Sequence, residues 1–279
     1  MDLKKEENKE LLLEQIDTTL EEYNSFLKEL ANGDKHQYHR SALLTYWLTD
    51  YLNYVKREDN FDPRYLKLYN RGDILSVDFG YKLGREFGGR HYAVVIEDST
   101  RTAPNVVVLP LRSFKDKDKN GVHYTEINLG NELYYSFSRK KKQVFQEFEE
   151  AFKNVEVQKK DLEESIDAFS SIMNDLKNDA EKQDSFERIR NFKTKAEKKL
   201  RELKQAEEIL NDAQDAFLQV FNQFRDMKEG SIAMVKQITT ISKMRILNPL
   251  SEKDALADIK LSSNKLNIID EQIKKFFTH

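Results

Sequence analysis

The sequence has no cysteine among its 279 residues. This excludes disulfide bonds, thiolate metal ligands and cysteine nucleophiles. Long apolar runs are missing as well. None approaches the roughly 20 residues of a membrane helix, and the N-terminal stretch MDLKKEENKELLLEQ has no signal-peptide core. We therefore expect a soluble, cytoplasmic protein with no membrane partner.

Neither sign of charge dominates. The chain has 46 basic and 49 acidic residues, which leaves a net charge of -3. The net charge therefore gives no long-range electrostatic attraction to nucleic acids or acidic membranes, and any RNA contact must depend on a local basic patch. Histidine is scarce, with five copies. Only His36 and His39 are three residues apart, a spacing more typical of a helix surface than of a metal site, so we expect no metal and no cofactor.

Glycine is also rare, and four of its nine copies gather within residues 80–90. This segment separates the first two of three runs that are rich in Val, Ile, Leu or aromatic residues and bounded by Gly, Pro or Asn, as strands are. The three runs cover residues 73–79, 92–97 and 105–111. Glycines allow a close approach to the backbone, and the segment carries Arg85 and Arg90, so it is a candidate phosphate-contact loop.

Helical patterns lie on both sides of these strands. In residues 1–68, apolar residues recur every three or four positions over two stretches separated by the sequence NGD at 32–34, which predicts a helical hairpin. Residues 251–279 show the same spacing and predict one amphipathic C-terminal helix.

Residues 136–228 form two arms in which apolar residues keep a three-four spacing for about six heptads, broken only at Lys159 and Lys199. Sustained heptads predict coiled-coil helices. The arms are nearly equal, about 40–45 residues or 60–65 Å at 1.5 Å per residue, so the chain returns to where it left. We therefore expect an antiparallel coiled coil inserted between two strands of one β domain.

Five short segments carry a family resemblance: RGDI at 71–74, GREFGG at 84–89, YAVVI at 92–96, VLPL at 108–111 and SIAMVKQITTISKMRI at 231–246. Together they resemble the MazF/PemK family of toxin endoribonucleases. The resemblance implies an α+β fold with a small antiparallel β barrel of the kind shared with the CcdB toxin. Residues 69–135 and 229–250 would build the barrel, helices would flank it, and the coiled coil would interrupt it.

The barrel core follows from the alternation of apolar residues along each strand. The predicted core residues are Ile74, Val77, Phe79, Ala93, Val95, Val107, Leu109, Ile232, Met234 and Ile238. In any one strand the opposite alternation is the alternative.

The resemblance also implies an activity, the metal-independent cleavage of single-stranded RNA through attack by the ribose 2′-OH. Such a reaction needs a base for the 2′-OH proton, an acid for the 5′ leaving oxygen, and cations for the charge that develops on the phosphate. A family member would be a toxin held in check by a cognate antitoxin protein, and we expect a two-fold homodimer.

His91 stands where the family usually has a catalytic arginine. A histidine can act as acid or base near neutral pH, while Arg90 or Arg85 supplies the charge; alternatively His91 only satisfies a backbone carbonyl at a strand end. Arg112 and Ser113 match the end of the family's third strand. There Ser113 would bind a phosphate oxygen and Arg112 would add charge, unless Ser113 is merely an exposed strand end. The predicted catalytic residues are therefore His91, Arg90, Arg112 and Ser113.

The segment 231–246 adds predicted RNA contacts. Gln237, Thr240 and Arg245 keep the family pattern, whereas Thr239 and Ser242 stand where the family often has arginine and aspartate. Arg245 is the best candidate for a contact to the RNA backbone, with a salt-bridged structural arginine as the alternative. The predicted RNA-binding residues are Arg85, Gln237, Thr239, Thr240 and Arg245.

The substituted positions leave two other functions open. In the first, the barrel has lost catalysis and serves as a module that binds protein or RNA. In the second, the chain is a toxin that acts on a protein target, because the barrel fold is shared with the CcdB toxin. A fold by itself does not decide between such functions.

Overall fold

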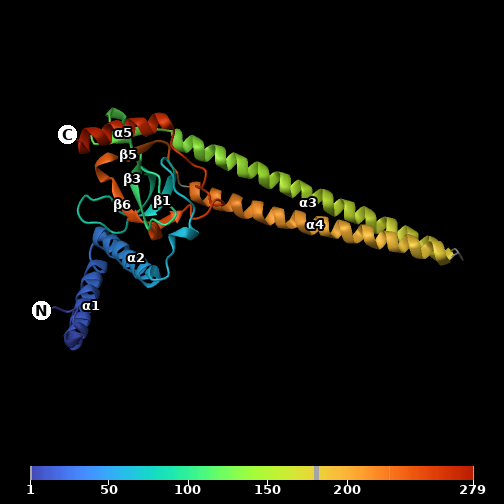
Figure 1. Cartoon of the computed structure of the whole chain (residues 1–279), viewed down its shortest axis with the longest axis horizontal. Coiled ribbons are helices and arrows are strands. Elements are labelled where there is room, and N and C mark those ends of the chain that lie inside the picture. The colour runs from blue at the N-terminus through green and yellow to red at the C-terminus, as the bar shows by residue number, and fades with distance from the viewer. Residues whose placement is uncertain (1, 179–181, 226, 279) are drawn as a thin grey trace. The chain divides into compact units, whose positions relative to one another are not determined.

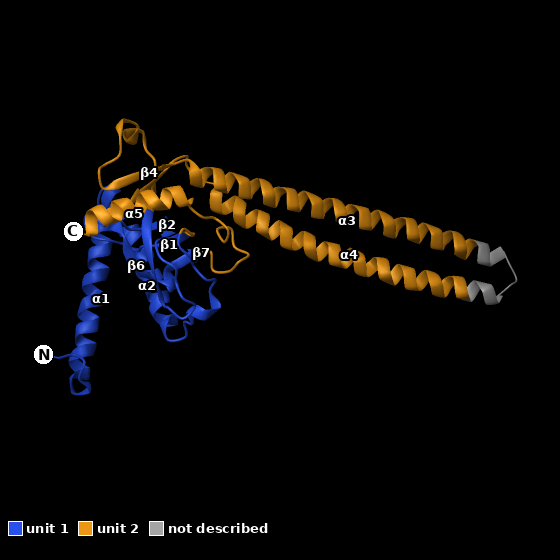
Figure 2. Ribbon diagram, turned by 45° about the horizontal axis from the view of Figure 1, so that its top comes forward, with its two compact units in different colours: residues 1–71, 75–110, 237–247 blue, residues 72–74, 111–236, 248–279 orange. Residues whose placement is uncertain are grey.

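The structure, a computed structural model, describes residues 2–178, 182–225 and 227–278, without the side chains of residues 175–178 and 182–186. It consists of two compact units, and the chain passes between them several times. Unit 1 contains residues 1–71, 75–110 and 237–247, and unit 2 contains residues 72–74, 111–236 and 248–279 (Figure 2). The expected division into five consecutive segments stays a prediction.

Unit 1 begins with two helices, α1 (Lys9–Ala31) and α2 (Lys35–Glu58), which lie where the apolar spacing predicted them. A capping box starts α2. The Asp34 side chain accepts a hydrogen bond from the Gln37 N–H at 2.8 Å, and the Gln37 side chain accepts one from the Asp34 N–H at 2.9 Å. Along α1 only Leu30 is buried, so this helix contributes little to a core.

Five strands contribute to unit 1: β1 (Ile74–Asp78), β2 (Arg90–Val95), β3 (Asn105–Ser113), β6 (Thr239–Ser242) and β7 (Ile246–Asn248). Ile74, residues 111–113 and Asn248 at their ends belong to unit 2. Both β2 and β6 pair antiparallel with β3, so that Val94 lies opposite Leu109 and Thr240 lies opposite Val107. The three strand runs expected between residues 73 and 111 are thus present.

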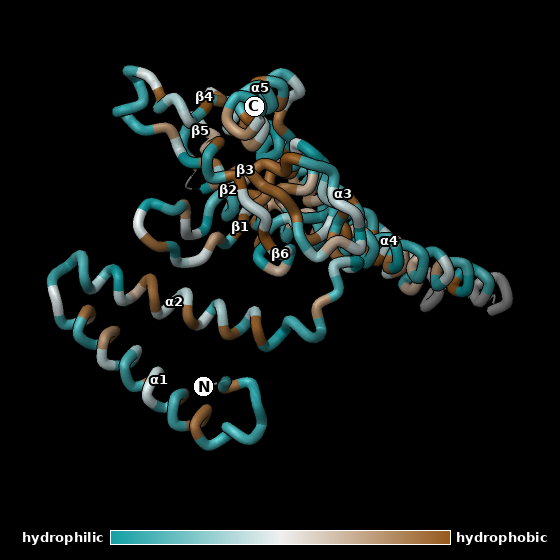
Figure 3. Tube along the Cα trace, turned by 60° about the vertical axis from the view of Figure 1, so that its left-hand side comes forward, coloured by the Kyte–Doolittle hydropathy of each residue, from teal (hydrophilic) through white to brown (hydrophobic). Residues whose placement is uncertain are grey.

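The core of unit 1 lies among these strands, and Figure 3 shows apolar positions concentrated there. It consists of Tyr69, Leu75, Val77, Phe79, Ala93, Val95, Val106, Val108, Ile241 and Ile246. Most of the core residues predicted from the sequence are buried, but Val107, Met234 and Ile238 are only half-buried. In the first half of β3 the opposite alternation holds, with Val106 and Val108 inward. A period of two fixes the spacing of inward residues, not which set faces the core.

Lys243, which ends the TTISK part of the family-like segment, is also buried in unit 1, with 1% of its surface exposed. Its Nζ donates a hydrogen bond to the Thr100 carbonyl at 2.8 Å and lies 5.7 Å from the centre of the Tyr69 ring. Burial lowers the pKa of Lys243. These contacts hold the loop between β2 and β3 in place, so the role of Lys243 is structural.

Unit 2 contains β4 (Glu126–Gly130), β5 (Ser231–Met234) and α5 (Ser263–Phe277). β5 pairs antiparallel with β4 and with the last residues of β3. The Ser262 side chain caps α5 by accepting a hydrogen bond from the Lys265 N–H. The amphipathic C-terminal helix expected from the sequence is therefore present, although it starts about a dozen residues later than 251.

The strands form one antiparallel seven-stranded sheet in the order β4-β5-β3-β2-β1-β7, with β6 also paired to β3. β3 is the longest strand, and its two halves pair with β6 and β5 respectively. Among the described residues, β4 and β7 are the first and last strands of this order and do not pair with each other. After β4 the chain turns directly into a helix at Glu132. The α+β class and the antiparallel pairing are confirmed, but the sheet is not closed, so the predicted small barrel is present only as an open antiparallel sheet.

Two long helices, α3 (Glu132–Asn178) and α4 (Lys182–Phe224), occupy most of the predicted insertion. They run side by side in opposite directions in both views (Figures 1 and 2). Stacked rings join them along their length: Phe137 with Phe224, Phe148 with Phe217, and Phe169 with Phe192. The antiparallel pairing of the arms is therefore present. Their supercoiling stays a prediction, and the turn at 179–181 lies outside the described residues.

Both lysines that interrupt the heptads have partners on the opposite helix, and Lys159 on α3 forms an ion pair with Glu207 on α4 at 4.0 Å. Lys199 reaches across from α4, and its Nζ donates to the Asp161 carbonyl at 2.8 Å and to the Ser165 hydroxyl at 2.5 Å on α3. A charged group in an apolar seam is tolerated when its donors are satisfied. Lys199 therefore fixes the register of the two helices rather than breaking their packing.

Candidate functional site

A cleft of about 920 Å³ lies in unit 1, lined by one face of α2, the end of β1 and the 80–90 loop. Its aromatic lining comes from Tyr46 and Trp47 on α2 and Tyr81 on the loop. Basic residues Lys82 and Arg90 line it as well. Exposed aromatic rings beside cations are the combination with which proteins bind single-stranded nucleic acids.

The neck of the loop is closed by two backbone hydrogen bonds. The Gly89 N–H donates to the Gly80 carbonyl at 2.8 Å, and the Phe79 N–H donates to the Gly89 carbonyl at 2.9 Å. Gly80 has φ +72°, and a Cβ there would lie 2.6 Å from the Trp47 ring. Only glycine meets both requirements. The glycine-rich sequence thus lets Trp47 of α2 rest directly on the loop.

Arg90, a predicted catalytic residue, begins β2 and faces the cleft. Its guanidinium donates to the Asp50 carboxylate of α2 at 2.9 Å. This hydrogen bond raises the pKa of Arg90. Because 63% of the Arg90 side chain is exposed, the pair is screened by solvent and contributes little to stability. Arg90 is therefore held by α2 but not buried by it.

Asp78, at the end of β1, connects α2 with the last strands. Its carboxylate accepts hydrogen bonds from the Tyr54 hydroxyl and from the Gly80 N–H, both at 2.9 Å. Its backbone carbonyl accepts one from Nε of Arg245 at 2.8 Å. Burial, followed by the negative charge of Asp78, raises the pKa of Tyr54 to about 12. Tyr54 is thus a neutral hydrogen-bond donor that ties α2 to the sheet.

Arg245, the best predicted contact to an RNA backbone, lies beneath α2. Its guanidinium is 5.4 Å from the centre of the Trp47 ring, which is within cation–π range. Burial lowers the pKa of Arg245. Among the described residues its buried Nη2 has no hydrogen-bond partner. A buried donor left unpaired is costly, so Arg245 has capacity for an acceptor that this arrangement does not supply.

His91 lies on the other face of β2 from Arg90, because neighbouring residues of a strand point to opposite faces. It does not line the cleft. Its ring centre is 4.4 Å from that of Phe87, and the Phe87 N–H donates to the Gln237 side-chain oxygen at 3.4 Å. The structure thus gathers His91 and Gln237 around Phe87, and it gathers Arg90 and Arg245 under α2.

The other predicted RNA-binding residues are more scattered. Arg85 is exposed on the 80–90 loop. Thr239 and Thr240 lie on β6, opposite Val108 and Val107 of β3, where Thr240 is exposed and Thr239 half-buried. They lie on the same sheet as Arg90 without joining the cleft lining.

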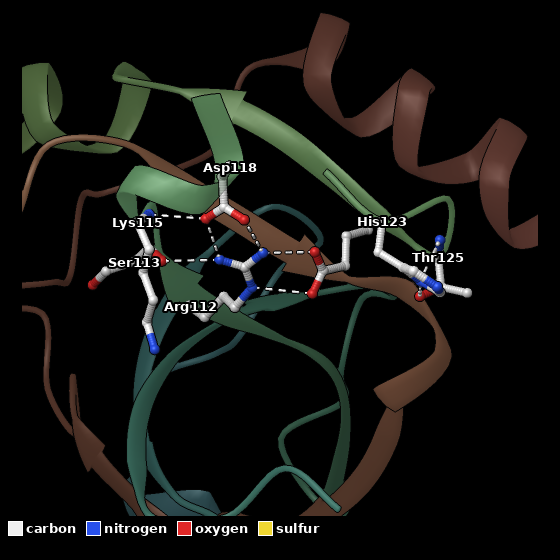
Figure 4. Close-up of polar contacts among 7 residues, drawn as sticks. Arg112, Ser113, Lys115, Asp118, His123 and Thr125 are labelled. Carbon is white, nitrogen blue, oxygen red and sulfur yellow. Dashed lines mark hydrogen bonds and ion pairs between the residues drawn. The ribbon is translucent and has the colours of Figure 1, made fainter. Parts of the chain in front are cut away.

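Arg112 and Ser113 end β3 in unit 2, and Figure 4 shows Arg112 between two carboxylates. Its guanidinium donates to both oxygens of Asp118, at 2.7 and 2.9 Å, and to both oxygens of Glu126, at 3.0 and 2.6 Å. A fifth hydrogen bond, at 3.2 Å, goes to the Ser113 carbonyl. All five N–H groups of the guanidinium are thereby used. We expect Arg112 to stabilise unit 2, since a contact to phosphate would require this network to open. Ser113 itself is exposed.

The network predicts how acid affects stability. Hydrogen bonds from Arg112 lower the pKa of Asp118 to about 2 and also lower the pKa of Glu126, compared with ordinary values of 3.8 and 4.5. A carboxylate with a lowered pKa in the folded state stabilises fully above its ordinary pKa and loses that contribution as the pH falls toward the folded value. Urea unfolding between about pH 5 and pH 2 should therefore show a steeper loss of stability for the natural protein than for Arg112→Met. Equal slopes would contradict this role.

Sequence reasoning missed the acidic partner on α2. The three-four spacing of apolar residues in the second helix includes Trp47 and Tyr54, and Asp50 lies between them at helical spacing without an assigned role. A carboxylate within an inward apolar stripe was the available signal, because such a group needs a cationic partner. Which cation it would meet could not be read from the pattern, since Arg90 is 40 residues away.

No group of three or more His, Asp or Glu side chains in the described part of the chain could hold a metal ion. A search of the same residues found no helix that is both long and apolar enough to cross a membrane.

Comparison with known families gives one match. Residues 70–137 match a family model described as PemK-like, MazF-like toxin of type II toxin-antitoxin system. The chain therefore carries a toxin domain of this kind, which confirms the resemblance seen in the 71–111 motifs, and the match supports a toxin of a toxin–antitoxin system. The matched segment contains the 80–90 loop, His91 and Arg112, whereas α2, Gln237 and Arg245 lie outside it. A search of curated proteins finds no significant match.

Proposed function

We propose that this protein is the toxin of a type II toxin–antitoxin system and that it cleaves single-stranded RNA without a metal ion. The observation that supports this most directly is the 80–90 loop. It lies within the segment that matches the toxin family, and it leads into β2, where Arg90 faces a cleft lined with aromatic and basic residues and His91 lies on the opposite face.

The cleft suits a single-stranded nucleic acid. Bases of any sequence stack on aromatic rings, and phosphates are neutralised by lysine and arginine. Tyr81 on the loop would supply a ring, while Lys82 and Arg90 would supply charge. Arg85 on the exposed loop would extend this basic surface to neighbouring nucleotides. A duplex would not present its bases to such a surface.

In the proposed reaction, the neutral imidazole of His91 removes the proton from the ribose 2′-OH. The 2′ oxygen forms a bond to phosphorus, and the bond from phosphorus to the 5′ oxygen breaks. A water molecule gives a proton to the departing 5′ oxygen, and the resulting hydroxide takes the proton from the His91 imidazolium. The products are a 2′,3′-cyclic phosphate, which water can open to a 3′-phosphate, and a 5′-OH. Arg85 on the exposed loop would stabilise the charge on the reacting phosphate, while Arg90 and Arg245, on the other side of β2 from His91, would bind phosphates of neighbouring nucleotides.

Four further residues, Phe87, Gln237, Thr239 and Thr240, would support this chemistry. Phe87 holds the His91 ring against its own ring at 4.4 Å. Gln237, which accepts from the Phe87 backbone, has an amide NH₂ that can donate to a phosphate oxygen. The Thr239 and Thr240 hydroxyls would contact flanking nucleotides. The role of Ser113 as a hydroxyl donor to a phosphate oxygen stays part of this proposal.

The family implies an antitoxin protein as partner, and we expect that partner to block the basic surface of the 80–90 loop. The homodimer expected from the resemblance stays a prediction, which light scattering at micromolar concentration can decide.

Incubation of the purified protein with RNA of mixed sequence in EDTA tests the proposal. We expect fragments that carry a 2′,3′-cyclic phosphate or 3′-phosphate and a 5′-OH, because the 2′-OH is the nucleophile and no metal takes part. DNA of the same sequence is the matched control and should stay intact, since it lacks the 2′-OH. Intact RNA, or cleavage that requires added metal, would reject the mechanism.

A module that binds or poisons a protein is the second candidate. Exposed apolar side chains on α1 favour it, among them Leu13 at 52% and Leu20 at 62% exposure. Patches of this kind commonly mark protein interaction sites. Intact RNA in the assay above, together with stoichiometric binding of one purified protein partner, would favour this candidate.

A further inference from the structure

Three polar contacts tie α2 to the rim of the cleft. Asp50 binds Arg90 at 2.9 Å, and Tyr54 donates to Asp78 at 2.9 Å. Farther along the helix, Nε of Arg40 donates to the Tyr81 hydroxyl at 3.2 Å. All three reach from α2 to β1, β2 or the loop between them. They hold one face of α2 against the proposed RNA-binding surface.

Trp47 fills the centre of this contact. Its ring lies so close to Gly80 that a Cβ on that residue would be within 2.6 to 2.9 Å of three ring atoms. The same ring lies over the Arg245 guanidinium at 5.4 Å. The indole therefore fills the space above the loop neck, and no nucleotide base can stack there while α2 is in place.

Of the two arginines beneath α2, only Arg90 has a carboxylate partner. Arg90 is neutralised by Asp50, and Nη2 of Arg245 has no hydrogen-bond partner among the described residues although it is buried. Asp78 and Glu86 add further negative charge to the cleft lining, against Lys82. An RNA phosphate would give both arginines acceptors, but it has to compete with the Asp50 carboxylate at Arg90 and with the Trp47 ring that lies over Arg245.

The attachment of α2 is weak enough to be reversed. Its ion pair to Arg90 is largely exposed, and such pairs contribute little net stability. Ser41 is the only buried residue among those described on α2. A helix held by few buried groups opens more readily than a core element.

We infer that α2 is an intramolecular cover of the RNA-binding cleft, which competes with RNA for Arg90 and Arg245 and has to move away for RNA to bind. This inference rests on the proposed function. It adds that the contacts of α2 limit the activity of the full chain even when no antitoxin is bound.

The double variant Asp50→Asn, Tyr54→Phe tests it in the full chain, because it weakens two anchors of α2 and changes none of the proposed RNA contacts. We expect it to bind a single-stranded 2′-O-methyl RNA about 10-fold more tightly than the natural protein in fluorescence anisotropy. Asp59→Asn is the matched control, since it removes the same charge from an exposed position just after α2 and should leave the affinity unchanged.

Trp47 is the only tryptophan of the chain, so its fluorescence reports on the cover directly. Without RNA, the double variant should be quenched by acrylamide more strongly than the natural protein and the control. RNA at saturation should raise the quenching of the natural protein toward the same level. Circular dichroism establishes that the helices remain folded.

The outcomes separate this inference from the proposed function. If every variant cleaves and binds RNA alike, the cover is refuted and the ribonuclease stands. If the double variant binds RNA more weakly, α2 is part of the RNA site rather than a competitor, which also refutes the cover. If Trp47 becomes accessible but neither RNA binding nor cleavage appears in any variant, the ribonuclease proposal fails and the cover of an RNA site fails with it.

Discussion

Replacing His91 by alanine should lower the rate of RNA cleavage by about 10²–10⁴-fold, the usual contribution of a general acid or base. The side chain sits at the start of β2, half-buried and held against Phe87. If it exchanges protons with the 2′-OH or the leaving oxygen, the loss should fall on kcat rather than on KM. Single-turnover cleavage of a short RNA measures it.

A second substitution separates proton transfer from mere packing at this position. His91→Arg introduces the residue that the family usually has there, so it should retain more activity than alanine and should lack the limb of the pH–rate profile near neutral pH. His123→Ala is the matched control. That histidine is exposed in unit 2, with Nδ1 2.8 Å from the Thr125 hydroxyl, and its loss should leave the rate unchanged. If His91→Ala keeps full activity, His91 has only a structural role at the end of the strand.

The largest expected effect on stability concerns Arg112. Replacement by methionine should lower the free energy of unfolding by about 3–5 kcal/mol, because it leaves the buried carboxylates of Asp118 and Glu126 without a counter-charge. The side chains of Arg112 and Glu126 are each 13% exposed, and that of Asp118 is 5% exposed, so solvent cannot replace the lost donors. Urea unfolding followed by circular dichroism measures the change.

Two further variants test whether the geometry of the guanidinium matters. Arg112→Lys keeps the charge but cannot donate to both carboxylates in two parallel pairs, so it should recover only part of the loss. Arg188→Met, at an exposed position of α4, should change stability by no more than about 0.5 kcal/mol. If Arg112→Met and Arg188→Met change the free energy of unfolding by similar amounts, the Arg112 network does not stabilise the fold.

The arginines of the predicted site have different roles. Arg112, predicted as catalytic from the resemblance, is fully engaged by carboxylates. The proposed charge for RNA binding comes instead from Arg90 and Arg245, whose donors face the cleft or lack a partner, and that for the reacting phosphate comes from Arg85 on the exposed loop. A site with different residues at several positions can retain its chemistry if the charges are supplied from nearby elements.

The sequence by itself determined the elements whose signals are local. A three-four spacing of apolar residues located α1, α2, α5 and the two long arms, and β-rich runs bounded by turn residues located β1, β2 and β3. Motifs at 71–111 identified the family later matched at 70–137. These features depend on residues a few positions apart, where periodicity and turn chemistry act directly.

Only the tertiary structure decided which distant groups meet. The sheet is open, with β3 pairing along its length to both β6 and β5, and no strand pattern specifies such a partner. Asp50 meets Arg90 across 40 positions, and Trp47 meets Gly80 and Arg245. Charges and rings have many candidate partners in a chain with 46 basic and 49 acidic residues. The choice among them is made by the packing of α2 on the loop, because the fold brings only a few of those groups within reach of one another.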